Sequence, residues 1–156
     1  MAGLLFEEWA HTQLSKPGSH IMQLLSNRSV TRTLSITSPL AIQMFDDHEL
    51  ETKISNFHGS DRGHQTLYLR PKNQRFKAVD SFLLPETLFQ ITVSKQKACP
   101  DIASIISKLQ KGGKAANIVM VYVVPAAHVP SFSAGTYTGQ PNGQVKQFVL
   151  GLDIRQ

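Results

Sequence analysis

Apolar side chains near the start of the chain recur with helical spacing. Phe6, Ala10 and Leu14 are four residues apart, so residues 4–14 are expected to form a helix with one buried side. Glu7 shares the spacing of Ala10 and Leu14, which places its side chain toward the buried side of that helix. An acid at such a position is a candidate for a functional site.

A second apolar stripe runs through residues 99–111. Its members follow the i, i+3, i+4, i+7 spacing of a half-buried helix: Ile102, Ile105, Ile106 and Leu109. Pro100 suits the first helical position, and Gly112-Gly113 is expected to end the helix. The unbroken apolar run at 118–124 is rich in β-branched residues and predicts a strand buried on both faces.

Shorter alternating or apolar stretches predict further strands and short elements. They cover residues 20–25, 30–37, 39–45, 66–70, 76–84, 88–94 and 148–154. The acidic residues 46–51 are expected to form a loop or an exposed helix, and residues 59–63 and 130–143 to form turns and loops. A strand–helix–strand crossover ending in a buried strand predicts one α/β domain over residues 1–156. We expect a two- or three-layer sandwich with a mixed central sheet flanked by helices.

Polar residues interrupt the apolar pattern where two of these strands should pair. Side chains alternate between faces along a strand, so Gln90, Thr92 and Ser94 are expected to share one face and their apolar neighbours the other. Asp80 lies on the preceding strand. An acid, an amide and hydroxyl groups at one edge of a sheet are suited to binding a metal ion and facing a phosphate.

Positive charge is concentrated around this polar segment. The chain has a net charge of +5, but residues 62–114 hold ten basic and three acidic residues, whereas residues 1–61 hold four basic and seven acidic ones. A focused basic region is typical of nucleic-acid binders, and it equally suits the solvated face of an ordinary basic protein. The candidate contacts to a phosphate backbone are Arg70, Lys72, Arg75, Lys77 and Lys97.

Composition and motifs argue against several other classes of protein. Hydrophobic residues make up 41% of the chain and charged residues 17%, which suits a packed core and not a disordered tail. No apolar run reaches the ~18 residues of a membrane span, and no signal peptide is visible. A single cysteine, Cys99, argues against a zinc site at His58 and His64. Neither a phosphate-binding P-loop nor a nucleophile elbow is present.

The order of elements and motifs resembles the PD-(D/E)XK restriction-endonuclease-like superfamily, whose core runs α-β-β-β-α-β. The similarity is closest to the divergent nuclease-like domains of Crinkler effectors and retrotransposon hot spot proteins. Phe6-Glu7 followed by Ala10-His11 is similar to their first helix, and Val79-Asp80-Ser81-Phe82 and Phe89-Gln90-Ile91-Thr92-Val93-Ser94 are similar to their metal-binding strands. The similarity covers most of residues 4–124.

The resemblance implies a magnesium-dependent active site. Asp80 and Gln90 would bind Mg²⁺, Glu7 would add a second acid, and Lys95 would stabilise charge on the phosphate. Each of these residues also has an ordinary structural interpretation. Asp80 would then make a turn or salt bridge, Gln90 would face outward from a half-exposed sheet, and Glu7 and Lys95 would be solvated. His11 is more often a hydrogen-bonded or surface histidine than a functional one.

Two positions depart from the superfamily pattern. Gln90 stands where a carboxylate is usual, and Thr92 stands where a lysine is usual. An amide oxygen can bind a hard cation but brings no charge. The hydroxyl of Thr92 cannot replace an ammonium group, although Lys95 or Lys97, just beyond the strand, could supply the positive charge.

These observations lead to two expected functions from different classes. The first is a metal-dependent DNA phosphodiesterase, or a nuclease-like DNA-binding domain, of a secreted effector that acts in the host nucleus, as the resemblance implies. The second is a degenerate nuclease scaffold that binds a host protein, which the loss of the acid-x-lysine pair favours. A homodimer is compatible with either, and a reducing compartment, nucleus or cytosol, suits the single cysteine.

Overall fold

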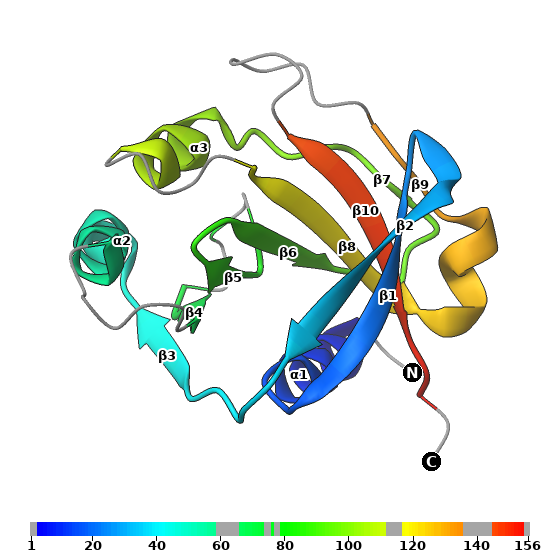
Figure 1. Cartoon of the computed structure of the whole chain (residues 1–156), viewed down its shortest axis with the longest axis horizontal. Helices are drawn as coiled ribbons and strands as arrows, with labels where there is room; N and C mark the ends of the chain where they lie inside the picture. Colours follow the sequence, from blue (N-terminus) through cyan, green and yellow to red (C-terminus); the bar gives the residue numbers. More distant parts are fainter. Residues whose placement is uncertain are drawn as a thin grey trace.

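A mixed sheet of eight strands forms the centre of the protein, with helices against both of its faces (Figure 1). The computed structural model describes residues 3–58, 66–73, 76, 79–111, 117–135 and 145–154. Their elements follow the chain in this order: α1 (Gly3–Leu14), β1 (Gly18–Leu24), β2 (Asn27–Ile36), β3 (Ile42–Phe45), η1 (Asp47–Glu49), α2 (Leu50–His58), β4 (Leu67–Pro71), β5 (Ser81–Leu84), β6 (Thr87–Ile91), β7 (Gln96–Lys97), α3 (Ala103–Gln110), β8 (Val119–Pro125), η2 (Ala126–Ser131), β9 (Ser133–Ala134) and β10 (Lys146–Leu152). The expectation of an α/β sandwich with a mixed, helix-flanked sheet is confirmed at this level.

The strand order in the sheet is β2-β1-β10-β8-β6-β5-β4-β3. Three neighbours, β6, β8 and β10, run parallel, while β4, β5 and β6 form an antiparallel meander. All seven residues of β8 are buried, because this strand has a neighbour on each side and side chains packed on each face. The predicted doubly buried strand is therefore confirmed.

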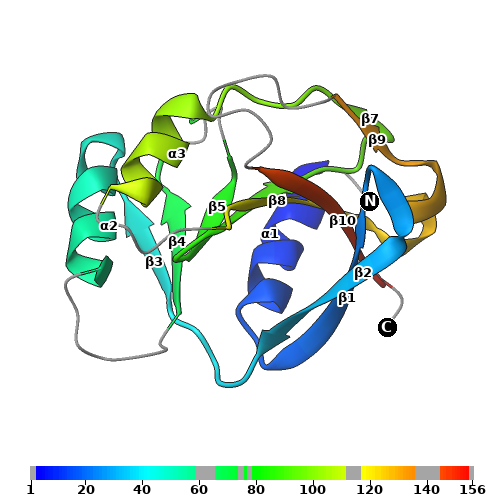
Figure 2. The ribbon, with the colours of Figure 1, turned by 45° about the horizontal axis from the view of Figure 1, so that its top comes forward.

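Two separate apolar clusters fill the two faces of the sheet. α1 contributes Phe6, Ala10 and Leu14 to one cluster, as its helical spacing predicts. α2 and α3 contribute to the other cluster, and Figure 2 shows these two helices side by side and well separated from α1. We call the two sides of the sheet the α1 face and the α2/α3 face.

The second predicted helix forms, but it begins later than its sequence suggests. α3 starts at Ala103, so the prediction that Pro100 occupies the first helical position is wrong. Upstream, β7 pairs with β9, residues 98–102 belong to neither a helix nor a strand, and the Asp101 carboxylate accepts the Ala103 N–H just before the helix. The predicted apolar stripe is buried as expected.

Other boundaries also shifted. The acidic segment at 46–51 contains the 3₁₀ turn η1 and continues into the nine-residue helix α2, whose Leu50 and Ile54 are buried in the core. The strand expected at 76–84 is limited to Ser81–Leu84. The predicted turn at 59–63 lies outside the described residues. Within the described part of the chain, no helix is long and apolar enough to cross a membrane.

Candidate functional site

Asp80 occupies an irregular position immediately before β5. Val79 is buried on the α2/α3 face, whereas the Ser81 hydroxyl meets Tyr68 on the α1 face, so the alternation of side chains breaks at Asp80. The Asp80 N–H donates to the Phe89 carbonyl at 2.8 Å, and its carboxylate accepts the Ile91 N–H at 2.6 Å. Irregularities of this kind re-aim a side chain, and here the carboxylate turns toward α1.

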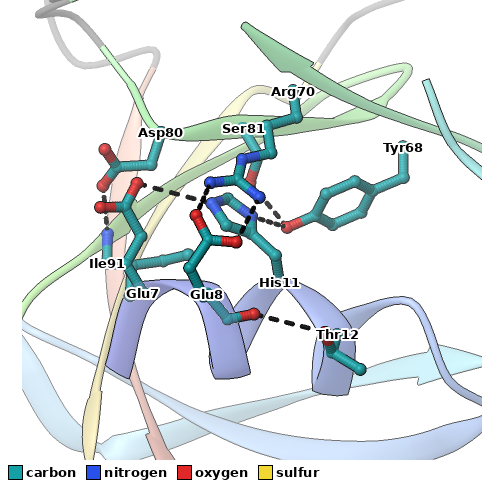
Figure 3. A network of polar contacts seen from close by, with 9 residues as sticks. All are labelled: Glu7, Glu8, His11, Thr12, Tyr68, Arg70, Asp80, Ser81 and Ile91. Atoms are coloured by element: carbon teal, nitrogen blue, oxygen red, sulfur yellow. Dashed lines mark hydrogen bonds and ion pairs between the residues drawn. The ribbon is translucent and has the colours of Figure 1, made fainter. Parts of the chain in front are cut away.

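The Glu7 carboxylate lies beside Asp80 (Figure 3). Burial raises the pKa of Asp80 to about 6, and the neighbouring Glu7 charge acts in the same direction, while the Ile91 N–H and the Lys97 charge oppose it. Glu7 itself is 30% exposed, so the pair opens to solvent on the Glu7 side. Two carboxylates sharing one site disfavour double ionisation, and a bound cation would relieve their repulsion.

A chain of buried polar side chains extends from Glu7 into the protein. His11, only 1% exposed, holds its Nε2 3.5 Å from Glu7 Oε1. Its Nδ1 lies 2.7 Å from the Tyr68 hydroxyl, which lies 2.8 Å from Ser81 Oγ. Ser81 follows Asp80 directly in the sequence, so the chain runs from Glu7 to the residue next to Asp80.

Arg70 and Glu8 form a bidentate ion pair beside this network (Figure 3). The hydrogen bond from Arg70 holds the pKa of Glu8 below its usual value. Glu8 is 51% exposed, and Arg70, a predicted phosphate contact, is already engaged by a carboxylate in the protein itself. Arg70 therefore reaches a phosphate only by giving up this pair.

Gln90 lies on the opposite face of the sheet from Glu7. Its strand neighbours Phe89 and Ile91 belong to the α1 cluster, while its cross-strand partner Tyr122 belongs to the α2/α3 cluster. Gln90 is 8% exposed, and its Oε1 has no hydrogen-bond partner among the described residues. The structure thus brings Glu7 and Asp80 together and sets Gln90 apart from them, and metal binding by Gln90 stays a prediction.

The residues after Gln90 leave the sheet. β6 ends at Ile91, Thr92 donates its N–H to the Val123 carbonyl, and Thr92 Oγ1 accepts the Ser94 N–H, so the predicted alternation does not continue. The side chains of Lys95 and Lys97 make no ion pair with any acid in the described ranges, and Lys95 is exposed.

The remaining predicted phosphate contacts differ in what surrounds them. Lys72 lies 3.6 Å from Asp46, and both side chains are about half exposed. Arg75 and Lys77 lie outside the described residues. Among the described members of the predicted basic set, Lys97 is the one best placed to contact a phosphate. It makes no ion pair with a described acid, and its charge acts on Asp80.

Glu7 and Asp80 are the candidate metal ligands of this site. Among the described residues, no group of three or more His, Cys, Asp or Glu side chains could hold a metal ion. Mg²⁺ is usually held by one or two carboxylates together with waters and substrate phosphates, so Glu7 and Asp80 could serve as its protein ligands. The two acids alone do not complete the coordination of a metal ion.

Sequence analysis missed part of the network. Tyr68 and Ser81 carry no motif that separates them from ordinary strand residues, and only their burial on the α1 face joins them to His11. Glu7 on the buried side of the first helix was the available signal for an acid aimed at the sheet. Searches of protein-family models, curated proteins and solved structures found no match to this chain.

Proposed function

We propose that the domain is a nuclease-like module that binds a divalent cation at the Glu7–Asp80 pair and cleaves or binds DNA. The observation that carries this proposal is the buried Asp80 carboxylate, placed beside Glu7 and with its pKa raised to about 6. Strongly perturbed acids that a fold holds together are typical of functional sites. Burial of the Asp80 charge costs stability, which a position without a functional role would have no reason to retain.

The element order supports a restriction-endonuclease-like scaffold. α1 precedes the antiparallel β4–β5–β6 meander, and α3 then leads to β8, which runs parallel to β6. This order agrees with the α-β-β-β-α-β order that the resemblance implies, if β1, β2, β3, η1 and α2 are taken as an insertion after the first helix and β7 as a short addition between β6 and α3. Asp80 stands at the start of the second strand of the meander and Glu7 on the first helix, where the resemblance expects acids.

In this proposal Glu7 and Asp80 would hold Mg²⁺, and a DNA phosphate and water would supply further ligands. When bound, such an ion activates water and neutralises the scissile phosphate. The Ile91 N–H holds one oxygen of Asp80 in place, and the Asp80 carboxylate also hydrogen-bonds Glu7, a contact that a cation between the two acids would replace. Lys97 and Lys95 would contribute positive charge toward the phosphate backbone.

A cleavage assay tests the proposal. The full chain is incubated with supercoiled plasmid and with single-stranded DNA in Mg²⁺, Mn²⁺ or EDTA, and Mn²⁺ affinity is measured by calorimetry. Asp80→Asn and Glu7→Gln should each abolish metal-dependent cutting and weaken Mn²⁺ binding by at least about tenfold, because each removes a charged ligand. Glu51→Gln is the matched control, since Glu51 pairs with Lys111 on the α2/α3 side.

A second candidate function rests on a different observation. On the α1 face, Ile91 at the end of β6 and Val93 just after the strand are apolar, and such side chains neither bind a metal nor stabilise phosphate charge. This favours a catalytically inert nuclease scaffold that binds a host protein. Wild-type protein that binds neither Mn²⁺ nor DNA at low salt would support this second function and refute the first.

A further inference from the structure

His11 is the one buried imidazole that touches the proposed cation pair in the described structure. It lies on α1 one turn after Glu7, and its ring is edge-on to Tyr68 at a centroid distance of 5.9 Å. Both ring nitrogens are therefore placed, Nδ1 against the Tyr68 hydroxyl and Nε2 against the Glu7 carboxylate (Figure 3). Which nitrogen carries the proton decides what His11 does to Glu7.

The hydroxyl protons of Ser81 and Tyr68 favour one direction of hydrogen bonding along the chain. Ser81 is fully buried, and its hydroxyl has one hydrogen-bond partner among the described residues, the Tyr68 hydroxyl. If Ser81 donates to Tyr68, then Tyr68 donates to His11 Nδ1 and every hydroxyl proton is used. If Tyr68 instead donated to Ser81, the Ser81 proton would lack an acceptor, at a cost of about 1–3 kcal/mol.

The favoured arrangement makes His11 a donor toward Glu7. With Nδ1 accepting from Tyr68, a neutral imidazole carries its proton on Nε2. Nε2 has no hydrogen-bond partner among the described residues, and Glu7 Oε1, 3.5 Å away, is its nearest acidic group. The opposite tautomer would direct a nitrogen lone pair at a carboxylate.

We infer that His11 is a positioning residue: fixed by Tyr68 as the Nε2–H tautomer, it donates to Glu7 and holds that carboxylate facing Asp80 so that the pair can take a cation. This rests on the proposed cation site. Hydrogen bonds of catalytic groups are often long in free enzymes and tighten with ligand, which suits the 3.5 Å separation. Groups that orient metal ligands typically contribute about 10- to 100-fold in metal affinity.

The test measures tautomer and cation affinity separately. Nitrogen-15 NMR of the full chain reports which His11 nitrogen is protonated without any cation, and calorimetry measures Mn²⁺ affinity. We expect Nε2–H in the wild type, a roughly 10- to 100-fold affinity loss in His11→Phe, and a smaller loss in His11→Gln, whose amide can still donate. Tyr68→Phe should allow the other tautomer and weaken Mn²⁺ binding.

Tyr122→Phe is the matched control for Tyr68→Phe, because it removes a tyrosine hydroxyl on the α2/α3 face that donates to Gln147 and not to His11. It should keep both the tautomer and the affinity. An Nδ1–H tautomer, or a folded Tyr68→Phe protein that binds Mn²⁺ as tightly as wild type, would overturn the role of His11 alone. A wild type with the Nε2–H tautomer and no Mn²⁺ binding would overturn the cation site itself and, with it, this role.

Discussion

The two faces of the sheet differ in how they use buried polar groups. On the α2/α3 face, the helices pack aliphatic and aromatic side chains against the strands, and Gln90 is the buried polar side chain that its strand directs there. On the α1 face, an equally buried cluster encloses His11, Ser81 and the Tyr68 hydroxyl. These groups form a chain that runs from the Glu7 carboxylate to Ser81, which follows Asp80 in the sequence.

The difference indicates a division between the faces, with stability resting mainly on one and chemistry on the other. Apolar burial contributes to stability roughly in proportion to area, so the α2/α3 face is where substitutions should unfold the protein. Buried acids cost stability, so substitutions of the acidic residues on the α1 face should change chemistry at little or no cost to folding. The following predictions, from the largest effect to the smallest, test that division.

Shortening a core side chain on the α2/α3 face should give the largest loss of stability. Ile106 is fully buried on α3, and Ile106→Ala should lower the free energy of unfolding by about 2–5 kcal/mol, through lost burial and a residual cavity. Urea denaturation measures the change, with Ile106→Val as the milder control. A loss below about 1 kcal/mol would show that this face is loosely packed.

Asp80→Asn should stabilise the protein near neutral pH. The pKa of Asp80 is about 6 in the folded protein against 3.8 for an ordinary aspartate, so the native state holds a proton more tightly. Wild-type stability should therefore fall as the pH rises from about 4 to about 6 and then level off. Removing the charge should recover up to about 3 kcal/mol at pH 7, at about 1.36 kcal/mol per pKa unit.

Thermal unfolding of both proteins from pH 4 to pH 8 checks this. The two curves should approach each other at pH 4 and separate above pH 6, and the Asn side chain can still accept the Ile91 N–H. A mutant less stable than wild type at pH 7 would mean that the carboxylate is a structural group, and the contrast between the faces would fail.

Substitutions of Gln90 test whether this residue lies apart from the proposed metal site. Gln90→Leu should be neutral or stabilising by about 1 kcal/mol, because it removes an amide oxygen buried without a described partner, and it should leave Mn²⁺ affinity unchanged. Gln90→Glu should destabilise the protein by placing a charge on the apolar face. Weaker Mn²⁺ binding in Gln90→Leu, or tighter binding in Gln90→Glu, would instead assign Gln90 to the metal site.

The Glu8–Arg70 pair should contribute least. Glu8 is half exposed, and solvent screens its interaction with Arg70, so Glu8→Gln should cost less than about 1 kcal/mol. The cost should shrink further in 1 M salt, because screening weakens exposed pairs. A larger, salt-independent loss in denaturation experiments would place Glu8 within the buried network.

Much of the fold follows from local patterns in the sequence. Helical spacing determines that Phe6, Ala10 and Leu14 face a core, and the β-branched run at 118–124 determines a central buried strand, because these periods belong to the backbone geometry itself. The acidic segment 46–51, which forms η1 and the start of α2, suits either a loop or an exposed helix, because it contains few apolar residues.

The candidate site was determined by sequence only in part. The helical position of Glu7 aims it at the sheet, and the motif around Asp80 marks an acid near a strand start. The face of Gln90 depends on strand register and on the irregularity at Asp80, where the alternation breaks. Only the tertiary structure brings Tyr68 to His11, because a contact across 57 residues is made by packing and carries no local signal.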